Sequence, residues 1–396
     1  MNPRNRLAAI VAAATVFNIP LSIPVRGNEP QRLDDELVFD GWISLFDGQT
    51  LHGWKQEVDG NWRVANGTIT VSEGEVGLLR TTSQFSDYQL YLEFSADADT
   101  NSGVFIRTSP KPRNPAADCY EINIAPADNP FPTASLVARK RADSKVVTHD
   151  WHTLEITADS GSIQISLDGE TVTDFDDPNP LGRGYIGLQH NSGRVAFRNV
   201  RLRPLHLKSL FNGENLDGWR HHPDSQSEFS VTESGELNVK NGRGQLETDQ
   251  SFGDFVLQLD CIAHGDGLNS GIFFRCIPGE FMMGYESQIE NRFKDGDPNQ
   301  PLDCGTGGIF RRQDARRVVA RDRQWFSKTL VVVGPRIAVW VNGYQVTDWS
   351  DQRREHENPR KGLRLIPGSI IIQGHDPTTD LSLRNLRAAE LPERNY

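Results

Sequence analysis

The strand that decides the fold is written twice in this chain. Residues 101–107 read NSGVFIR and residues 269–275 read NSGIFFR. After the glycine, side chains alternate between the two faces of a strand, because successive residues of a strand point to opposite sides. The two heptads stand 168 positions apart (269 − 101 = 168). A repeat of that length indicates a duplicated domain rather than a solenoid.

Other segments return in the same order and support the duplication. The pairs are SLFDGQTLHGW (44–54) with SLFNGENLDGW (209–219), SDYQLYLEF (86–94) with GDFVLQLDC (253–261), CYEINI (119–124) with GYESQI (284–289), SLDGETVTDF (166–175) with WVNGYQVTDW (340–349), and IGLQHNSGRVAFRNVRL (186–202) with IIIQGHDPTTDLSLRNLRA (370–388). We therefore predict a first copy over residues 38–205 and a second copy over residues 206–392. Almost no linker separates them, so the copies are expected to pack together.

Each copy is predicted to be all-β. Short alternating segments such as YQLYLEF (88–94) are bounded by Gly, Asn and Asp, which is typical of strands and turns. Asp168-Gly169 and Asn342-Gly343 each separate two alternating segments, and this dipeptide chemistry favours type I′ hairpins. Many strands in one copy indicate a two-sheet sandwich or jelly roll.

Composition and the N-terminus restrict the class of protein. With 37% hydrophobic and 24% charged residues, the chain is typical of a globular protein. Its formal charge of −11 argues against nucleic-acid binding, which needs a basic face. Two arginines precede the apolar segment LAAIVAAATVF (7–17), a pattern that predicts a signal peptide over residues 1–28. That segment is too short to span a bilayer, so we expect a periplasmic or secreted protein without a membrane span.

The four cysteines give no metal-binding pattern. Cys119, Cys261, Cys276 and Cys304 form no CxxC pair, so a structural zinc site is not expected. Cys261 alternates in phase with apolar residues and is predicted to pack in the core. Export permits disulfides, and Cys276 and Cys304 flank one strand-like segment, so these two could pair.

The period-two pattern also predicts which side chains share a face. Glu286 and Gln288 lie opposite Tyr285, and in the heptad Phe273 and Arg275 lie opposite the core-facing residues. The first copy repeats this arrangement with Glu121 and Arg107. A sheet face that combines carboxylate, amide, arginine and aromatic groups suits sugars. The alternative is a solvated face whose charges pair across strands.

Histidines follow glutamines at the ends of matching segments. His190 follows Gln189, and His375 lies two residues after Gln373. A single histidine at the end of a strand is commonly a solvated residue, but its recurrence beside glutamine in both copies favours a role in a site.

The combination of LFDG…GW, NSGxFxR, YExxI, LQHNSGRVAFRN and GYESQI…GTGGIF resembles the 3-keto-disaccharide hydrolase family over residues 40–203 and 207–390. The resemblance implies two tandem concanavalin A/laminarinase-like jelly rolls with the site on a concave sheet face. It also implies a bacterial, commonly exported protein that cleaves glycosides whose sugar is oxidised at C3.

The resemblance assigns the family's site pattern to matching residues of both copies. These are Arg107 and Arg275, Glu121 and Glu286, Gln189 with His190, and Gln373 with His375. The first copy departs from the pattern at Cys119 and Asn123, and it has PTASLVARK where the second copy has GTGGIFRRQ. We therefore expect the second copy to be the active one and the first to be degenerate or a binding partner.

The spacing of carboxylates weighs against ordinary glycoside hydrolysis. Glu286 and Glu290 stand four residues apart on one predicted strand, hence about 13 Å apart at ~3.3 Å per residue. Retaining and inverting hydrolases hold their two carboxylates closer than this. An ordinary hydrolase therefore requires a second carboxylate from a distant loop.

A 3-keto sugar needs one base, because the carbonyl acidifies the C2 hydrogen. Our hypothesis is proton abstraction and elimination followed by hydration, with Glu286 as base, Arg275 as enolate stabiliser and His375 as acid. The substrate-binding residues are predicted to be Asn269, Phe273, Gln288 and Gln373, with Glu121, Arg107 and His190 in the first copy. No cofactor is certain; a divalent metal on Glu286 and His375 is an open alternative. The rival functions are a non-catalytic carbohydrate-binding module and a purely structural sandwich.

Overall fold

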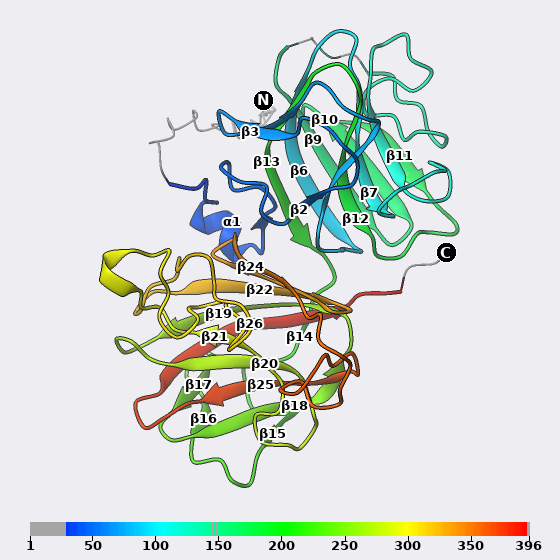
Figure 1. The fold of residues 1–396 in the computed structure, drawn as a ribbon. Coiled ribbons are helices and arrows are strands. Elements are labelled where there is room, and N and C mark those ends of the chain that lie inside the picture. The colour runs from blue at the N-terminus through cyan, green and yellow to red at the C-terminus, as the bar shows by residue number, and fades with distance from the viewer. Residues whose placement is uncertain (1–28, 145, 147–148, 394–396) are drawn as a thin grey trace, which may run out of the picture.

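The computed structural model describes residues 29–144, 146 and 149–393, so the signal peptide expected over residues 1–28 lies outside the described part. Two antiparallel β-sandwiches follow one another along the chain (Figure 1). Helix α1 (Asp35–Phe39) lies near the junction between them in Figure 1. The prediction of two tandem all-β sandwiches is confirmed.

The first copy consists of an eight-stranded and a five-stranded sheet. The larger sheet has the order β11-β10-β9-β6-β13-β4-β3, with β1 paired to β13, and the smaller has the order β2-β5-β12-β7-β8. The strands are β1 (Ile43–Ser44), β2 (Trp54–Gln56), β3 (Arg63–Ala65), β4 (Thr68–Val71), β5 (Gly77–Thr81), β6 (Tyr88–Ala96), β7 (Asn101–Thr108), β8 (Tyr120–Ile124), β9 (His152–Asp159), β10 (Ser162–Leu167), β11 (Glu170–Asp176), β12 (Tyr185–Ser192) and β13 (Val195–Pro204).

The second copy repeats this topology strand for strand. Its larger sheet has the order β16-β17-β26-β19-β22-β23-β24, with β14 paired to β26, and its smaller sheet has the order β15-β18-β25-β20-β21. The elements are β14 (Lys208–Ser209), β15 (Trp219–His221), β16 (Glu228–Val231), β17 (Leu237–Lys240), β18 (Gly244–Phe252), β19 (Phe255–Ala263), β20 (Ser270–Cys276), β21 (Tyr285–Ile289), the 3-10 turn η1 (Lys294–Gly296), β22 (Phe326–Val333), β23 (Arg336–Val341), β24 (Tyr344–Ser350), β25 (Gly368–Gly374) and β26 (Asp380–Glu390).

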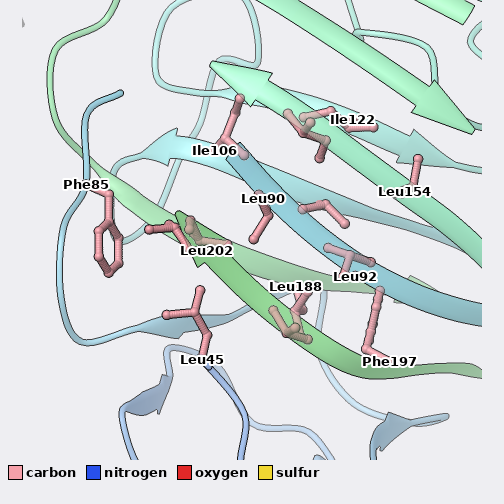
Figure 2. Packing of buried hydrophobic residues seen from close by; sticks show 14 of the residues in the cluster. Leu45, Phe85, Leu90, Leu92, Ile106, Ile122, Leu154, Leu188, Phe197 and Leu202 are labelled. Atoms are coloured by element: carbon pink, nitrogen blue, oxygen red, sulfur yellow. The ribbon is translucent and has the colours of Figure 1, made fainter. Parts of the chain in front are cut away.

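The core of each sandwich lies between its two sheets. In the first copy, Leu90 and Leu92 of β6 face Ile106 of β7 and Leu188 of β12 across the layer (Figure 2). Side chains that alternate with them point away from the core. The outer face of the five-stranded sheet is therefore left to carry other chemistry.

The two predicted hairpins are confirmed in detail. Asp168 and Gly169, between β10 and β11, have φ of 51° and 83°, and Asn342 and Gly343, between β23 and β24, have φ of 48° and 70°. Positive φ at both central residues defines the type I′ turn, which needs residues that tolerate the left-handed region.

The expected placement of the repeated arginines is wrong. Arg275 was expected on the outer face beside Phe273, but its side chain is 1% exposed and it has φ of 46°. The pairing of β20 with β25 shifts register between Phe273 and Cys276, so a bulge interrupts the alternation there. Arg107 shows the same features, with 1% exposure and φ of 47°.

Both arginines bind backbone carbonyls of separate loops and one aspartate. The guanidinium of Arg275 donates to Gly253 O (3.1 Å), Gly334 O (2.6 Å), Arg364 O (3.1 Å) and Asp254 Oδ1 (2.6 Å). In the first copy Arg107 donates to Ser86 O, Ser160 O, Leu181 O and Asp87 Oδ1. The repeated arginine is thus a structural residue that joins loops, since a buried charge is tolerated where it is paired and hydrogen-bonded.

The two copies are in direct contact. Trp340 of the second copy packs in the core cluster of the first, and its indole donates a 2.8 Å hydrogen bond to Ser44 O. Arg183 of the first copy pairs with Asp254 of the second at 2.8 Å. Since Asp254 also binds Arg275, one carboxylate joins the interface to the end of β20.

All four cysteines are buried and none forms a disulfide, so the suggested Cys276–Cys304 pair is not present in the structure. Cys261 packs in the core of the second copy as predicted. Among the described residues, no helix has the length and apolar character needed to cross a membrane.

Replacing Arg107 with Met should destabilise the first copy by about 3–5 kcal/mol, because Asp87 and three carbonyls would lose a buried partner. Urea unfolding of the full chain measures this loss. The matched control is Arg63→Met, whose exposed side chain should change the free energy of unfolding by less than about 0.5 kcal/mol. Equal effects of the two substitutions would contradict the structural role.

Candidate active site

The outer face of the second copy's five-stranded sheet holds a cavity of about 310 Å³. Six residues expected in the site line it: Asn269, Phe273, Glu286, Gln288, Gln373 and His375. The cavity therefore brings together strands β20, β21 and β25, of which the alternation predicted the contributions of β20 and β21. Phe273 is only 1% exposed and packs with Met282 and Ile371, so it forms the floor rather than an open stacking surface.

Glu286 is the central ionisable group of this cavity. Its carboxylate makes no hydrogen bond to any described residue, and the residue is 8% exposed. Burial raises the pKa of Glu286 to about 7, against the opposing influence of the Arg360 cation. Gly271 leaves room for this group, because a Cβ there would lie 2.8 Å from Glu286 Oε1. A carboxyl with this pKa exchanges a proton near neutral pH.

Amide side chains surround the carboxylate with unused acceptors. Asn269 Nδ2 donates to Asp303 Oδ2 (2.5 Å), and Gln288 Nε2 donates to the same oxygen (3.0 Å). Both amides are thereby oriented, and their oxygens, Asn269 Oδ1 and Gln288 Oε1, are buried without a hydrogen-bond partner among the described residues. Buried acceptors of this kind indicate a ligand that donates hydrogen bonds.

Gln373 and Gln245 extend the amide array on the neighbouring strands. They face each other across the β18–β25 ladder. Gln373 Oε1 and Gln245 Nε2 are both buried without a partner in the described part of the chain. The array thus offers acceptors and a donor, which matches the hydroxyl groups of a sugar.

His375 lies at the exposed rim of the cavity. Its Nδ1 is 2.8 Å from Asp376 Oδ2, so the neighbouring carboxylate orients the ring. Within the described ranges, no group of three or more His, Cys, Asp or Glu side chains is arranged to hold a metal ion. Glu286 and His375 alone do not make the three-ligand set typical of a catalytic metal site, and we derive no step through a metal.

Sequence reasoning missed three charged residues of the cavity: Arg243, which precedes β18, and the loop residues Asp303 and Arg360. Asp303 lies in a loop that is longer in the second copy. Equivalent hydrogen bonds join Val137 N to Glu121 O and Phe310 N to Glu286 O. These bonds span 16 residues (137 − 121) and 24 residues (310 − 286), so the second copy has an eight-residue insertion.

Arg360 comes from a second insertion. In the first copy the Tyr120 hydroxyl donates a hydrogen bond to Asp177 and accepts one from Leu181 N. In the second copy the Tyr285 hydroxyl donates to Asp351 and accepts from Arg364 N in the same way. The loops span 4 residues (181 − 177) and 13 residues (364 − 351), a difference of nine. Comparing the lengths of the two copies was the signal that could have located these residues.

A buried lysine lies behind the Glu286 strand. Lys328 of β22 is 0% exposed and crosses the core to donate to Ser287 O (2.8 Å) and Gln288 O (2.9 Å). Burial lowers the pKa of Lys328 to about 7. Lys328 pairs with Leu259 across the ladder between β19 and β22. Leu92 of the first copy matches Leu259 and pairs with Leu154, so the apolar Leu154 occupies the position equivalent to Lys328.

The first copy keeps part of the arrangement. Glu121, Phe105 and Gln189 line a cavity of about 260 Å³ on the equivalent face, and burial raises the pKa of Glu121 to about 7. Arg107 is absent from this face for the structural reason given above. His190 and His375 are not equivalent: His190 faces Ser102 across the ladder and is 4% exposed, and its ladder counterpart in the second copy is Gly374. His190 does not line the first-copy cavity, so its expected binding role stays a prediction.

Comparisons with known proteins agree with the duplication. A family model described as "3-keto-alpha-glucoside-1,2-lyase-like domain" matches residues 41–203 and again residues 206–388. A 3-keto-disaccharide hydrolase from Bacteroides thetaiotaomicron is 22% identical over 230 residues, which cover 42% of this chain and 79% of that protein. A crystal structure of a protein from Parabacteroides distasonis aligns with 45% of this chain and 100% of its own, at 21% identity and a TM-score of 0.39. A Bacillus licheniformis β-glucanase aligns with 46% and 97% respectively, at 15% identity and a TM-score of 0.33.

Lys328→Met should stabilise the protein more at pH 7.5 than at pH 9.5. Between the folded pKa of about 7 and the ordinary lysine pKa of 10.5, the unfolded state binds a proton that the folded state lacks. The native protein therefore loses stability as pH falls through this window. The advantage of the variant should grow by on the order of 2 kcal/mol over two pH units. Urea unfolding at both pH values measures it.

The matched control is Lys55→Met, because the Lys55 side chain is 58% exposed. Its effect on stability should be nearly the same at the two pH values. A pH-independent effect of Lys328→Met would show that Lys328 is charged throughout the window.

Proposed function

Because this chain belongs to the 3-keto-alpha-glucoside-1,2-lyase-like domain family, we propose that its second copy cleaves the glycosidic bond of 3-keto sugars by elimination and hydration. The observation that carries the proposal is a single desolvated carboxyl, Glu286, among amides whose acceptors are unused. We also propose that the leader expected over residues 1–28 delivers the protein to the periplasm or the medium.

The first step is removal of the C2 proton by Glu286. The C2–H electron pair moves into a C2–C3 double bond, and the proton is transferred to the Glu286 carboxylate, giving an enediolate whose negative charge lies on the C3 oxygen. Asn269, Gln288 and Gln373 hold sugar hydroxyl groups through their unpartnered oxygens. Such fixed hydrogen bonds orient C2 toward the base before reaction.

Arg360 replaces Arg275 as the residue that stabilises the enediolate. It lines the cavity and is the largest cationic influence on Glu286, whereas Arg275 is held in the interior. Its guanidinium is fixed by donation to Met282 O at 2.8 Å. A cation placed where negative charge develops lowers the barrier because it needs no reorganisation during the reaction.

The remaining steps release the aglycone and add water. The enediolate re-forms the C3 carbonyl and expels the C1 oxygen, which takes a proton from His375. The product is a C1–C2 alkene conjugated to the C3 ketone. Addition of water, OH at C1 and H at C2, gives the free 3-keto sugar. Glu286 returns a proton to C2 in this addition, His375 takes the proton that the attacking water loses, and the site is regenerated.

A second candidate is ordinary two-carboxylate hydrolysis, because Asp303 supplies the distant-loop carboxylate that this mechanism requires. However, Asp303 Oδ2 already accepts hydrogen bonds from Asn269 and Gln288. These bonds give Asp303 a role in orienting the two amides. A non-catalytic sugar-binding function is the third candidate, and it predicts affinity without a product.

The full-length protein should cleave 3-keto glucosides and leave the unoxidised parent glucosides intact, because only the ketone acidifies the C2 hydrogen. Mass spectrometry of each substrate mixture, with and without chelator, measures the products. In deuterated water the product should carry deuterium at C2, because the carboxyl proton of Glu286 exchanges with solvent before it is returned. Cleavage of the unoxidised parents would instead support two-carboxylate hydrolysis.

Glu286→Gln should abolish this turnover and leave the unfolding midpoint unchanged within a few degrees, since it removes only the base. The control Glu280→Gln lies on an exposed turn and should retain full activity. Binding of the keto sugar with no product from the wild-type protein would assign the cavity to the sugar-binding function.

Arg360→Met should lower kcat by about 10²–10³, the usual loss when one stabilising donor is removed. Activity of the wild type should rise as pH increases through about 7, because Glu286 must be ionised. Loss of the Arg360 cation should move this midpoint to higher pH, since the cation lowers the pKa of Glu286. Arg360→Lys should restore the midpoint in part, and an unshifted pH profile of kcat/KM in Arg360→Met would contradict the assignment.

A further inference from the structure

The cavity of the first copy is built for different chemistry from that of the second. Its walls are formed by Leu78, Phe105 and Cys119, which make a separate apolar cluster on the outer face of the five-stranded sheet. Pro110, Pro112 and Pro115 of the loop between β7 and β8 line it from above. The three cluster residues are 4% exposed or less, so this loop and the sheet enclose an apolar space.

Residue-by-residue comparison shows how the change arises. Leu78 pairs with Gln189 where Gln245 pairs with Gln373, so an apolar side chain replaces an amide at the centre of the sheet. Cys119 stands before Tyr120 where Gly284 stands before Tyr285, which adds a further apolar group. The first copy thus lacks part of the amide array that suits sugar hydroxyls.

The charged groups of the second site are also missing. Asp303 and Arg360 lie in loops that are eight and nine residues longer in the second copy, and no residue of the shorter first-copy loops lines the first cavity. Asn123, at the position of Gln288, donates its amide to Phe131 O and does not line the cavity. A polyhydroxylated sugar would therefore not find here the array of fixed amides that the second site offers, and the desolvation of its hydroxyl groups would be less well compensated.

The charged residues Glu57, Lys111 and Arg113 also line the cavity, and the polar pair Gln189 and Glu121 lines it beside the apolar cluster. Gln189 Oε1 is buried and has no hydrogen-bond partner within the described residues. Glu121 lies beside it and receives the hydrogen bond of the Gln189 amide. This pair leaves one acceptor unused at the end of an apolar space, so the matching ligand has one hydroxyl donor on an apolar body.

We propose that the first copy is a binding site for a neutral, planar phenol of one or two rings. The ring lies against Phe105 and Leu78, and the phenol hydroxyl donates to Gln189 Oε1. The volume of about 260 Å³ suits such a molecule, since a dry cavity of about 150 Å³ holds benzene. This inference does not depend on the proposed activity of the second copy.

The test is titration of the full-length protein with 2-naphthol, followed by ligand fluorescence and by calorimetry. One saturable site is expected, and glucose and cyclohexanol should not compete at equal concentration. Naphthalene should bind at least tenfold more weakly than 2-naphthol, because it cannot satisfy Gln189. Equal affinity for glucose, or no saturable binding of 2-naphthol, would overturn the proposal.

Matched variants place the site on the correct copy. Leu78→Gln introduces the amide found in the second copy and should weaken 2-naphthol binding at least tenfold. Gln245→Leu, the reciprocal change, should leave the first-copy site unaffected. Gln189→Met should remove the preference for 2-naphthol over naphthalene while keeping naphthalene binding. Circular dichroism confirms that each variant is folded, and loss of the signal in Gln245→Leu alone would move the site to the second copy.

Discussion

One buried guanidinium in each sandwich determines how the loops are arranged around the sheet. Arg275 binds three carbonyls from separate loops together with Asp254, and Arg107 does the same in the first copy. Burying carbonyl groups without partners would be costly, so the loops must converge on the arginine. Because Arg364 O is one acceptor, the loop that carries Arg360 is fixed at its C-terminal end by a contact outside the cavity.

The chemistry of the second site comes from a balance between burial and charge. The sheet desolvates Glu286, while Arg360, Lys328 and Arg311 favour its ionised form and Asp303 opposes it. Desolvation is the largest influence, and the pKa therefore rises to about 7. The core lysine and the loop arginine act from opposite sides of one strand. Thus the pKa of Glu286 depends both on the packing of the sandwich and on the exposed loop that carries Arg360.

The sequence alone was enough to predict the sheets and the strand-borne part of the site. Glu286 and Gln288 follow from period-two alternation, because regular strands obey it, whereas Gln373 was found through the repeat and the family resemblance. Arg275 was placed wrongly because a bulge with positive φ turns its side chain into the interior. The sequence of the heptad contains no signal that predicts this bulge. His190 was matched to His375 by similar letters although the ladder pairs it with another position. Asp303 and Arg360 lie in irregular loops, which no periodicity describes.

A loop whose two ends are fixed by hydrogen bonds can change in length with little effect on the stability of the sandwich. The Tyr285 hydroxyl holds both ends of the loop that carries Arg360, through hydrogen bonds with Asp351 and Arg364 N. The Tyr120 hydroxyl holds the equivalent first-copy loop through Asp177 and Leu181 N. Lengthening this loop from 4 to 13 residues costs only about 1 kcal/mol of closure entropy. A duplicated sandwich with such fixed loop ends is an evolvable scaffold. Insertions can give one copy a new electrostatic character while the other diverges toward a different ligand, and neither change has to be accommodated by the core.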